Sequence, residues 1–302
     1  MSHSERQGKP LHRPVLLREV LQMLDLHTGL CVVDGTMGAG GHSCKIAEQI
    51  EATGTLIGLD RDAMMLAFAE KKLANSPANC HLIQASYSEL PEVLKQFNLE
   101  QVDRVLLDLG LSSDQLADDS RGFSFNATGS LDLRFDTTTG QPAWELLETL
   151  SQQKLESAFK EYGEEKFSAK IAEAIVLQRK QKRLLTADQL VTIVTQAMPA
   201  KVVKMSSKHP ATRIFQALRI LVNDELGHLQ KMLDTILPQT IQPGGRAVII
   251  TFHSLEDRMV KVAFRKKEVW KQVTTKPVVA TATEQKINPR SRTAKIRTAI
   301  RL

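Results

Sequence analysis

Mostly apolar runs of four to six residues recur along the first 110 residues, which predicts strands that alternate with helices. The runs cover residues 30–33, 55–60, 81–85 and 105–108. Between them, apolar residues stand three or four positions apart, as on the buried face of a helix. This order favours a doubly wound, mainly parallel α/β sheet with helices on both faces. Ligands of such sheets bind beyond the carboxyl ends of the strands.

The alternation of strands and helices stops between residues 112 and 208. Helical periodicity dominates this segment, and Thr186 with Gln189 forms a capping-box signature for one of its helices. We therefore predict a helical substrate-binding domain of residues 112–208, inserted after the fourth strand. Residues 1–111 and 209–302 would together form a discontinuous sheet domain.

The pattern after the insertion predicts one long helix and two further strands. Pro210 suits the first position of a helix, and an apolar stripe runs from Ile214 to Ile236. Residues 246–252 form a strong candidate for a central strand. Cationic and apolar residues alternate over residues 295–302, which favours an edge strand with one buried face.

The segment after the first strand is a candidate nucleotide-binding loop. Asp34 closes the strand, and Gly35, Gly38, Gly40 and Gly41 follow within seven residues, so the backbone can turn tightly and approach a ligand. The spacing does not fit the Gly-x-Gly-x-x-Gly pattern of dinucleotide-binding proteins. It fits better a methyl-donor loop, in which glycines two residues apart follow an acidic strand end. The alternative is a turn that binds no ligand.

Asp60 repeats, at the end of the second strand, the position that Asp34 has on the first. A carboxylate about twenty residues after the glycines holds a ribose diol in this architecture, because it accepts hydrogen bonds from both hydroxyl groups. The alternative is that Asp60 or Asp62 caps the following helix. Asp108 ends the fourth strand in the same way. Three carboxylates at strand ends favour a binding edge over solvated strand termini.

Composition and charge narrow the class of protein. The 302 residues, 42% of them hydrophobic and 25% charged, suffice for one large domain or two. Residues 258–302 contain 13 Lys and Arg against two acidic residues, so the net charge of +6 leaves a net charge of −5 for the preceding residues. This basic region suggests an anionic partner, nucleic acid first, with a solvated basic tail as the alternative.

Cysteine spacing and hydropathy indicate the compartment. Cys31, Cys44 and Cys80 lack the spacing of disulfide frameworks or metal sites, which fits a reducing compartment. The sequence shows no apolar run of membrane-spanning length and no signal peptide, and we expect its first nine residues to be mobile. We therefore expect a cytoplasmic protein without a metal site and without membrane contacts.

Seven sequence blocks resemble those of the bacterial 16S rRNA (cytosine-N4)-methyltransferase family, the small-subunit rRNA methyltransferase H type. The blocks are HRPVL at residues 12–16, DGTMGAGGHS at 34–43, LDLGLSS at 107–113, RGFSF at 121–125, HPATR at 209–213, FHSLEDR at 252–258 and NPR at 288–290. They cover nearly the whole chain, including the insertion. Ordered blocks of this kind are far more specific than a glycine loop alone.

The resemblance implies a Rossmann-like class I methyltransferase with a helical substrate-recognition insertion. It also implies transfer of a methyl group from S-adenosyl-L-methionine to the exocyclic N4 amine of a cytidine in the decoding region of 16S rRNA. The partner would be small-subunit ribosomal RNA or the assembled small ribosomal subunit. We also consider a homodimer.

The resemblance further implies a cofactor pocket. In it, Gly40, Gly41 and His42 would line the methionine part of the cofactor, Asp60 would hold the ribose, Tyr87 would lie near the adenine, and Asp108 and Gln115 would complete the pocket. Two positions depart from the family pattern. Asp114 stands where the family usually has proline, and Tyr87 replaces a phenylalanine while keeping an aromatic face.

The acceptor amine is a poor nucleophile, because its lone pair is shared with the cytosine ring. Since the sulfonium is already activated, the enzyme mainly has to align the amine with the methyl–sulfur bond and exclude water. The chain lacks the proline pair that many base-amino methyltransferases place after the fourth strand. We hypothesise that His253, with Glu256 or Asp257, places or deprotonates the amine. The alternative is that His253 is a buried, hydrogen-bonded histidine.

Cations and aromatic side chains are candidates for RNA contacts. The candidates are Arg121, Phe123, Arg134, Arg213 and Arg258. Each arginine has the alternative of an internal ion pair.

Three other functions stay open. A nicotinamide oxidoreductase is disfavoured by the glycine spacing. A non-catalytic RNA-binding protein would not need the carboxylates at the strand ends. A DNA amino-methyltransferase is disfavoured by the missing proline pair.

Overall fold

The computed structural model describes residues 13–125, 127–206 and 209–302, and the expectation of a mobile start to the chain lies outside them. The chain divides into two compact units. The sheet unit contains the residues up to Asp60, Met64–Gly110 and Thr235–Leu302. The helical unit contains Arg61–Ala63 and Leu111–Asp234. Within the described ranges, no helix is long and apolar enough to cross a membrane.

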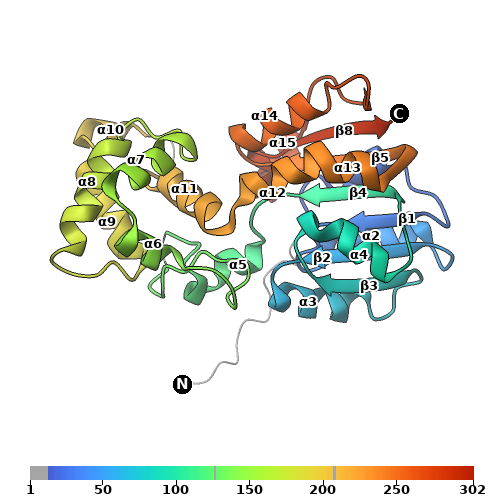
Figure 1. Ribbon diagram of the computed structural model, residues 1–302, viewed down its shortest axis with the longest axis horizontal. Helices are drawn as coiled ribbons and strands as arrows, with labels where there is room; N and C mark the ends of the chain where they lie inside the picture. Colours follow the sequence, from blue (N-terminus) through green and yellow to red (C-terminus); the bar gives the residue numbers. More distant parts are fainter. Residues whose placement is uncertain (1–12, 126, 207–208) are drawn as a thin grey trace. The chain divides into compact units, whose positions relative to one another are not determined.

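Parallel strands form the centre of the sheet unit (Figure 1). They are β1 (Cys31–Asp34), β2 (Thr55–Asp60), β3 (Asn79–Gln84), β4 (Val102–Asp108) and β5 (Ile241–Thr251). They lie in the order β3-β2-β1-β4-β5, which confirms the predicted doubly wound α/β sheet. Because these strands are parallel, the residues at their carboxyl ends share one edge of the sheet.

Antiparallel strands extend the sheet beyond β5. The last strand, β8 (Lys295–Arg301), pairs with β5 on one side and with β6 (Trp270–Gln272) and β7 (Val278–Val279) on the other. The prediction of an edge strand over residues 295–302 is therefore wrong. Its cause is that β6 and β7, with three and two residues, are too short to show any periodicity in the sequence.

Helices cover both faces of the sheet. Apolar side chains of α1 (Leu17–Leu24), α2 (Gly41–Ile50) and α3 (Ala63–Leu73) share one core cluster with residues of the sheet such as Val32 and Leu56. Helices α4 (Leu90–Gln96) and α13 (Leu237–Thr240) lie over the opposite face (Figure 1). Helix α14 (Ser254–Ala263) follows β5 and packs against β5 and β8.

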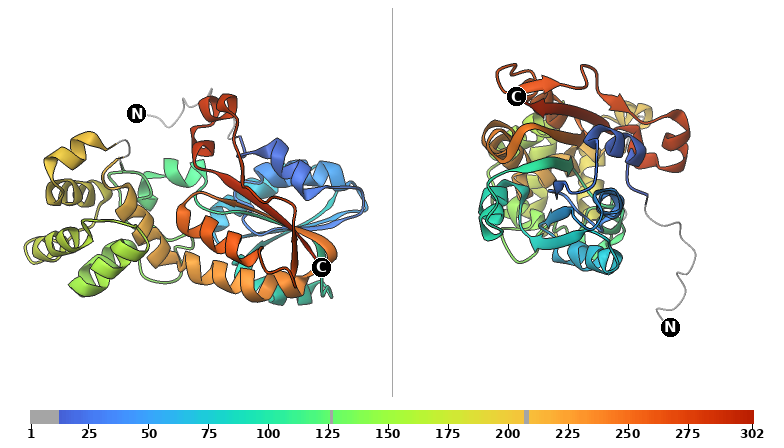
Figure 2. Two further views of the ribbon diagram at one scale, coloured as in Figure 1. Left: turned by 90° about the horizontal axis from the view of Figure 1, so that it is seen from above. Right: turned by 90° about the vertical axis from the view of Figure 1, so that its right-hand side faces the viewer.

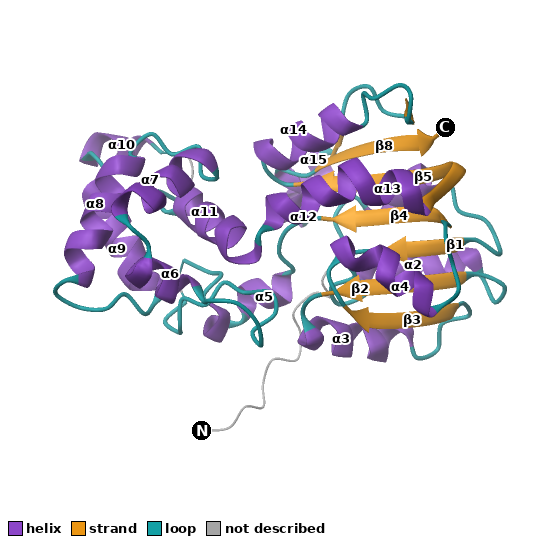
Figure 3. Cartoon of the chain, viewed as in Figure 1, coloured by secondary structure: helices purple, strands orange, loops and turns teal. Residues whose placement is uncertain are grey.

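The helical unit consists of helices and connecting loops, as Figure 3 shows. Its helices are α5 (Ser113–Ala117), α6 (Ala143–Thr149), α7 (Gln152–Glu161), α8 (Ser168–Arg179), α9 (Ala187–Ala197), α10 (Ala200–Met205), α11 (Thr212–Asn223) and α12 (Glu225–Lys231). Phe159, Ile171 and Leu218 belong to its buried core. The predicted capping box is confirmed, because the Gln189 side chain accepts a hydrogen bond from the Thr186 N–H at 3.3 Å.

The long helix predicted after Pro210 is interrupted. Asp224 adopts a left-handed conformation with φ +49°, which ends α11 and separates it from α12. The apolar stripe of α11 packs into the core of the helical unit through Ile214 and Leu218. Residues 209–234 therefore belong to the helical unit, whereas we predicted a boundary after residue 208.

Candidate functional site

The loop between β1 and α2 adopts a conformation that glycine favours. Gly38 and Gly40 have φ angles of +52° and +77°. A Cβ atom on Gly40 would lie 3.2 Å from the Cβ of Ala69, so the close approach of α3 also favours glycine. A Cβ atom on Gly38 would meet no atom of the described residues within 4 Å. The loop backbone therefore borders open space, as a ligand-binding loop requires.

The carboxylate of Asp34 stabilises this loop through hydrogen bonds. Its buried carboxylate accepts hydrogen bonds from the Ser43 Oγ–H at 2.6 Å and the Thr36 N–H at 3.3 Å. Burial raises the pKa of Asp34, because the charged form loses its hydration. The side chain thus ties the end of β1 to the first turn of α2.

Asp60, the predicted ribose ligand, contacts the same loop. Its Oδ2 accepts a hydrogen bond from the Gly38 N–H at 2.8 Å, which joins the end of β2 to the glycine turn. Tyr87 begins a short 3₁₀ turn after β3, η1 (Tyr87–Glu89), and its side chain is half-buried. Both residues lie at the carboxyl edge of the sheet, and their contacts with ribose and adenine stay predictions.

His42 lies in the first turn of α2 with a defined tautomer. Its Nε2 is 2.9 Å from the backbone oxygen of Val15, and a carbonyl oxygen can only accept, so Nε2 carries the proton. Burial lowers the pKa of His42, which favours the neutral ring. The other nitrogen, Nδ1, is then an acceptor. It lies 3.7 Å from Oδ2 of Asp108.

Asp108 ends β4 beside this histidine. Its backbone N–H donates to the Oγ1 of Thr36, which joins the ends of β4 and β1. Its Oδ1 is buried and has no hydrogen-bond partner among the described residues, while the side chain as a whole is 21% exposed. Burial raises the pKa of Asp108 to about 7. The positive charge of Arg290 lowers this pKa, and the negative charge of Glu256 raises it further.

A segment near the C-terminus contacts the residues that precede α1, and we did not predict it from the sequence. Helix α15 (Ala282–Ile287) and the 3₁₀ turn η4 (Pro289–Arg292) lie beside the start of the described chain (Figure 2). Glu284 Oε1 accepts from the Leu16 N–H at 2.7 Å, and Asn288 Nδ2 donates to the Arg13 carbonyl at 3.1 Å.

The sequence did contain a signal for α15. Thr281 and Glu284 form the Thr-x-x-Glu pattern of a helix start, and the Thr281 Oγ1 accepts from the Glu284 N–H at 3.2 Å. The pattern predicts a helix there. The hydrogen bond from Leu16 crosses 268 positions of the chain, so local patterns could not predict it.

His253, the predicted catalytic residue, caps helix α14. Its Nδ1 accepts a hydrogen bond from the Glu256 N–H at 3.4 Å, and its Nε2 lies 3.0 Å from Glu256 Oε1 without hydrogen-bond alignment. Asp257 binds Arg297 at 2.7 Å and Lys295 at 3.2 Å instead. This geometry favours the alternative of a hydrogen-bonded histidine. A catalytic role of His253 stays a prediction.

Gln115 and Arg121 meet at a buried carboxylate in the helical unit. Gln115 Nε2 donates to Asp62 Oδ2 at 2.9 Å, and Arg121 Nη1 donates to the same oxygen at 3.0 Å. Arg121 Nη2 also donates to the carbonyl oxygens of Arg134 and Phe135. These contacts favour an internal role for Arg121. A contact of Gln115 with a cofactor stays a prediction.

The other candidate RNA contacts differ in accessibility. Phe123 is 5% exposed and stacks on Phe135, and Arg134 makes a two-point ion pair with Asp132. Arg213 is more accessible, with a side chain that is 51% exposed and 3.9 Å from Glu165. Arg258 is exposed on α14. Accessibility therefore favours Arg213 and Arg258 for contacts with a phosphate backbone.

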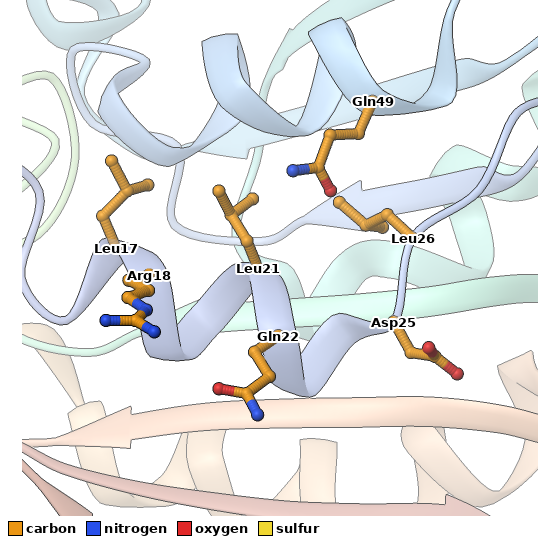
Figure 4. Close-up of a pocket in the computed structure, with 7 residues that line it drawn as sticks. All are labelled: Leu17, Arg18, Leu21, Gln22, Asp25, Leu26 and Gln49. Atoms are coloured by element: carbon orange, nitrogen blue, oxygen red, sulfur yellow. The ribbon is translucent and has the colours of Figure 1, made fainter.

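A separate pocket of about 590 Å³ lies between α1 and α2 (Figure 4). It is lined by Leu17, Arg18, Leu21, Gln22, Asp25, Leu26 and Gln49. The residues of the glycine loop are absent from this lining, so the pocket is distinct from the site at the carboxyl edge of the sheet.

The site at that edge suits an adenosine-based sulfonium cofactor. The glycine backbone leaves space, Asp60 supplies a carboxylate suited to a ribose diol, and Asp108 supplies a buried oxygen without a partner in the described chain. An anionic side chain near the loop also suits the positive charge of a sulfonium.

Comparison with known proteins shows matches over nearly the whole length of the chain. The model of the MraW methylase family matches residues 9–302. A ribosomal RNA small subunit methyltransferase H of Desulforapulum autotrophicum is 42% identical over 96% of this chain and 99% of its own length. A protein of the same name from Solidesulfovibrio magneticus is 41% identical over 98% of this chain and 97% of its own length. The structure of an rRNA methylase from Streptococcus thermophilus aligns with a TM-score of 0.43 at 12% identity, covering 97% of this chain and 99% of that one.

Proposed function

The chain belongs to the MraW methylase family, and on that premise we propose that it methylates the N4 amine of a cytidine in the decoding region of 16S rRNA. The cofactor is S-adenosylmethionine, which supplies an activated methyl group. The observation that carries the proposal is the similarity to small-subunit rRNA methyltransferases over almost the entire chain. An Asp108 oxygen at the carboxyl edge of the sheet, which has no hydrogen-bond partner among the described residues, supports it.

Residues of the sheet unit would hold the cofactor. The backbone at Gly40 and Gly41 and the side chain of His42 would face its methionine part. Asp60 would accept hydrogen bonds from the ribose hydroxyl groups, and Tyr87 would pack against the adenine. The hydrogen bond from Gly38 to Asp60 supports this assignment, because it orients the carboxylate at the glycine loop. Asp108 and Gln115 are proposed to complete the pocket.

RNA would be bound through cations on the surface of both units. We assign Arg213 and Arg258 to phosphate contacts, because both side chains are accessible. Arg121, Phe123 and Arg134 would support the fold around that surface, since they are buried or ion-paired. The substrate would be the ribosomal RNA or the assembled small subunit.

Methyl transfer from labelled S-adenosylmethionine tests the proposal. Small ribosomal subunits, naked 16S rRNA and double-stranded DNA are each incubated with the protein, and incorporated label is counted. We expect label in ribosomal RNA and none in DNA. Label in DNA would support the alternative of a DNA amino-methyltransferase, and RNA binding without any transfer would support a non-catalytic RNA-binding protein.

A further inference from the structure

We propose that Asp108 is the proton acceptor for the amine of the target base and that His42 positions its carboxyl group. This inference rests on the function proposed above. It assigns the base of the reaction to the end of β4 and not to His253.

The geometry of His42 prepares it to support Asp108. The hydrogen bond from Nε2 to the Val15 carbonyl fixes the proton on that nitrogen, so Nδ1 presents a lone pair. Nδ1 lies 3.7 Å from Asp108 Oδ2. A neutral carboxyl group can donate a hydrogen bond to such a nitrogen, whereas a carboxylate cannot. At 3.7 Å the two atoms are farther apart than in a hydrogen bond, so His42 favours the protonated state of Asp108 through the repulsion between its lone pair and the carboxylate charge.

The carboxylate of Asp108 also has an oxygen that receives no hydrogen bond within the described chain. Its Oδ1 is buried without a hydrogen-bond partner in the described chain, and an unpaired buried acceptor costs free energy. The amine of a cytosine carries two N–H donors. A substrate amine at Asp108 would satisfy this acceptor and direct its own proton toward the carboxylate.

Electrostatics supports the same assignment. Burial raises the pKa of Asp108 to about 7, so the group is a stronger base than an exposed aspartate yet is still largely ionised in mildly alkaline solution. The charged or titratable groups that act on the pair are Asp34 of β1, Glu256 of α14, Glu284 of α15 and Arg290 of η4. Arg290 lowers the pKa of Asp108, and Glu256 raises it.

His253 is less suited to this task. Its Nδ1 already accepts the hydrogen bond of the Glu256 N–H at the start of α14. A ring that gives this lone pair to a helix cap cannot use it to take a proton from the substrate.

The N4 lone pair forms a bond to the methyl carbon while the carbon–sulfur bond breaks and leaves its electron pair on sulfur. The nitrogen becomes positively charged and passes one of its protons to the carboxylate of Asp108. The products are a methylated amine, a neutral thioether and a neutral carboxyl group, which later releases its proton to water.

Single-turnover methyl transfer at saturating S-adenosylmethionine, measured from pH 5.5 to 9, tests this assignment. Binding of S-adenosylmethionine by each variant is measured by calorimetry. For Asp108→Asn we expect a rate at least about 10²-fold below wild type, and we expect the ascending limb of the pH profile to disappear. Retention of both the rate within a few-fold and the ascending limb would overturn the proposal.

Two further variants separate catalysis from folding. His42→Gln keeps an amide that can donate to the Val15 carbonyl but lacks the Nδ1 lone pair, so we expect folding and cofactor binding with a rate about tenfold lower. Arg290→Gln removes a positive charge and should move the ascending limb to higher pH. A fully active His42→Gln would remove His42 from the proposal, and an unmoved limb in Arg290→Gln would assign the titration to another group.

Failure of the proposed function can be distinguished from failure of the inference on Asp108. If the wild-type protein transfers no methyl group to a cytidine amine, the proposed function fails and this inference fails with it. If the wild type is active and Asp108→Asn is equally active, only the inference fails.

Discussion

At the scale of single residues, the site combines groups that support the fold with one that weakens it. Asp34 is buried but receives two hydrogen bonds, whereas Asp108 is largely buried and one of its oxygens has no partner in the part of the chain that the structure describes. A carboxylate kept in that state costs stability whenever it is ionised. Such a cost is expected where a side chain serves a ligand more than the fold.

The first prediction concerns Asp108 and protein stability. Because the folded-state pKa is raised to about 7, the folded protein binds more protons than the unfolded chain between pH 4 and pH 7, so this group lowers stability as pH rises through that window. Asp108→Asn removes the effect. For cofactor-free protein we compare the free energy of unfolding of Asp108→Asn with that of wild type at each pH. The variant minus wild-type difference should be about 2–3 kcal/mol larger at pH 8 than at pH 5. Urea unfolding at both pH values measures this, and a difference that does not change with pH would contradict it.

The second prediction concerns His253. Since its ring caps α14 and the proton acceptor is assigned to Asp108, His253→Asn, which keeps a capping acceptor, should retain methyl transfer within a few-fold of wild type. His253→Ala should lose about 1 kcal/mol of stability through the missing cap. Labelled methyl transfer and thermal unfolding check the two variants. A loss of 10²-fold or more in the stable Asn variant would restore His253 as a catalytic candidate.

At the scale of elements, the sequence patterns predicted those features that are determined by residues close to one another in the chain. The carboxylates at the ends of β1, β2 and β4 followed from apolar runs that each stop at an aspartate. The break at Asp224 did not follow, because the apolar stripe of α11 and α12 continues across it. The two-residue strand β7 carries no periodicity at all. Contacts between distant segments, such as Glu284 with Leu16, depend on the folded chain and not on spacing.

The third prediction concerns the link between α15 and the start of the described chain. Glu284→Ala leaves the N–H of the buried Leu16 without its acceptor, which should cost about 1–3 kcal/mol of stability. Glu284→Gln keeps an oxygen at that position and serves as the matched control. Denaturant unfolding and hydrogen exchange at the Leu16 amide measure the effect. Equal stability of the Ala and Gln variants would show that the hydrogen bond contributes little.

At the scale of the whole molecule, charge predicted the kind of partner but not the residues that contact it. The excess of cations in residues 258–302 suggested a nucleic acid. Several of those cations are engaged internally, since Arg297 and Lys295 bind Asp257. In the helical unit, the sequence could not separate buried Arg121 from exposed Arg213, because ion-pair partners become adjacent only on folding.

The fourth prediction concerns binding of ribosomal RNA. Arg213→Gln should weaken RNA binding and reduce the slope of log affinity against log salt by about 1, as expected for one lost phosphate contact. Lys154→Gln removes an exposed cation of α7 and is the control for charge alone. Filter binding or fluorescence anisotropy over a range of salt concentrations gives both slopes. If the two variants behave alike, Arg213 makes no specific phosphate contact.

The position of the transferred methyl group tests the central claim most directly. Small subunits from cells that lack the protein are incubated with the purified protein and S-adenosylmethionine carrying a deuterated methyl group, and the digested 16S rRNA is analysed by mass spectrometry. We predict the deuterated methyl group on the N4 amine of a cytidine in the decoding region. A label confined to a ring carbon, a ribose hydroxyl group or another base, or the absence of any label, would contradict the account.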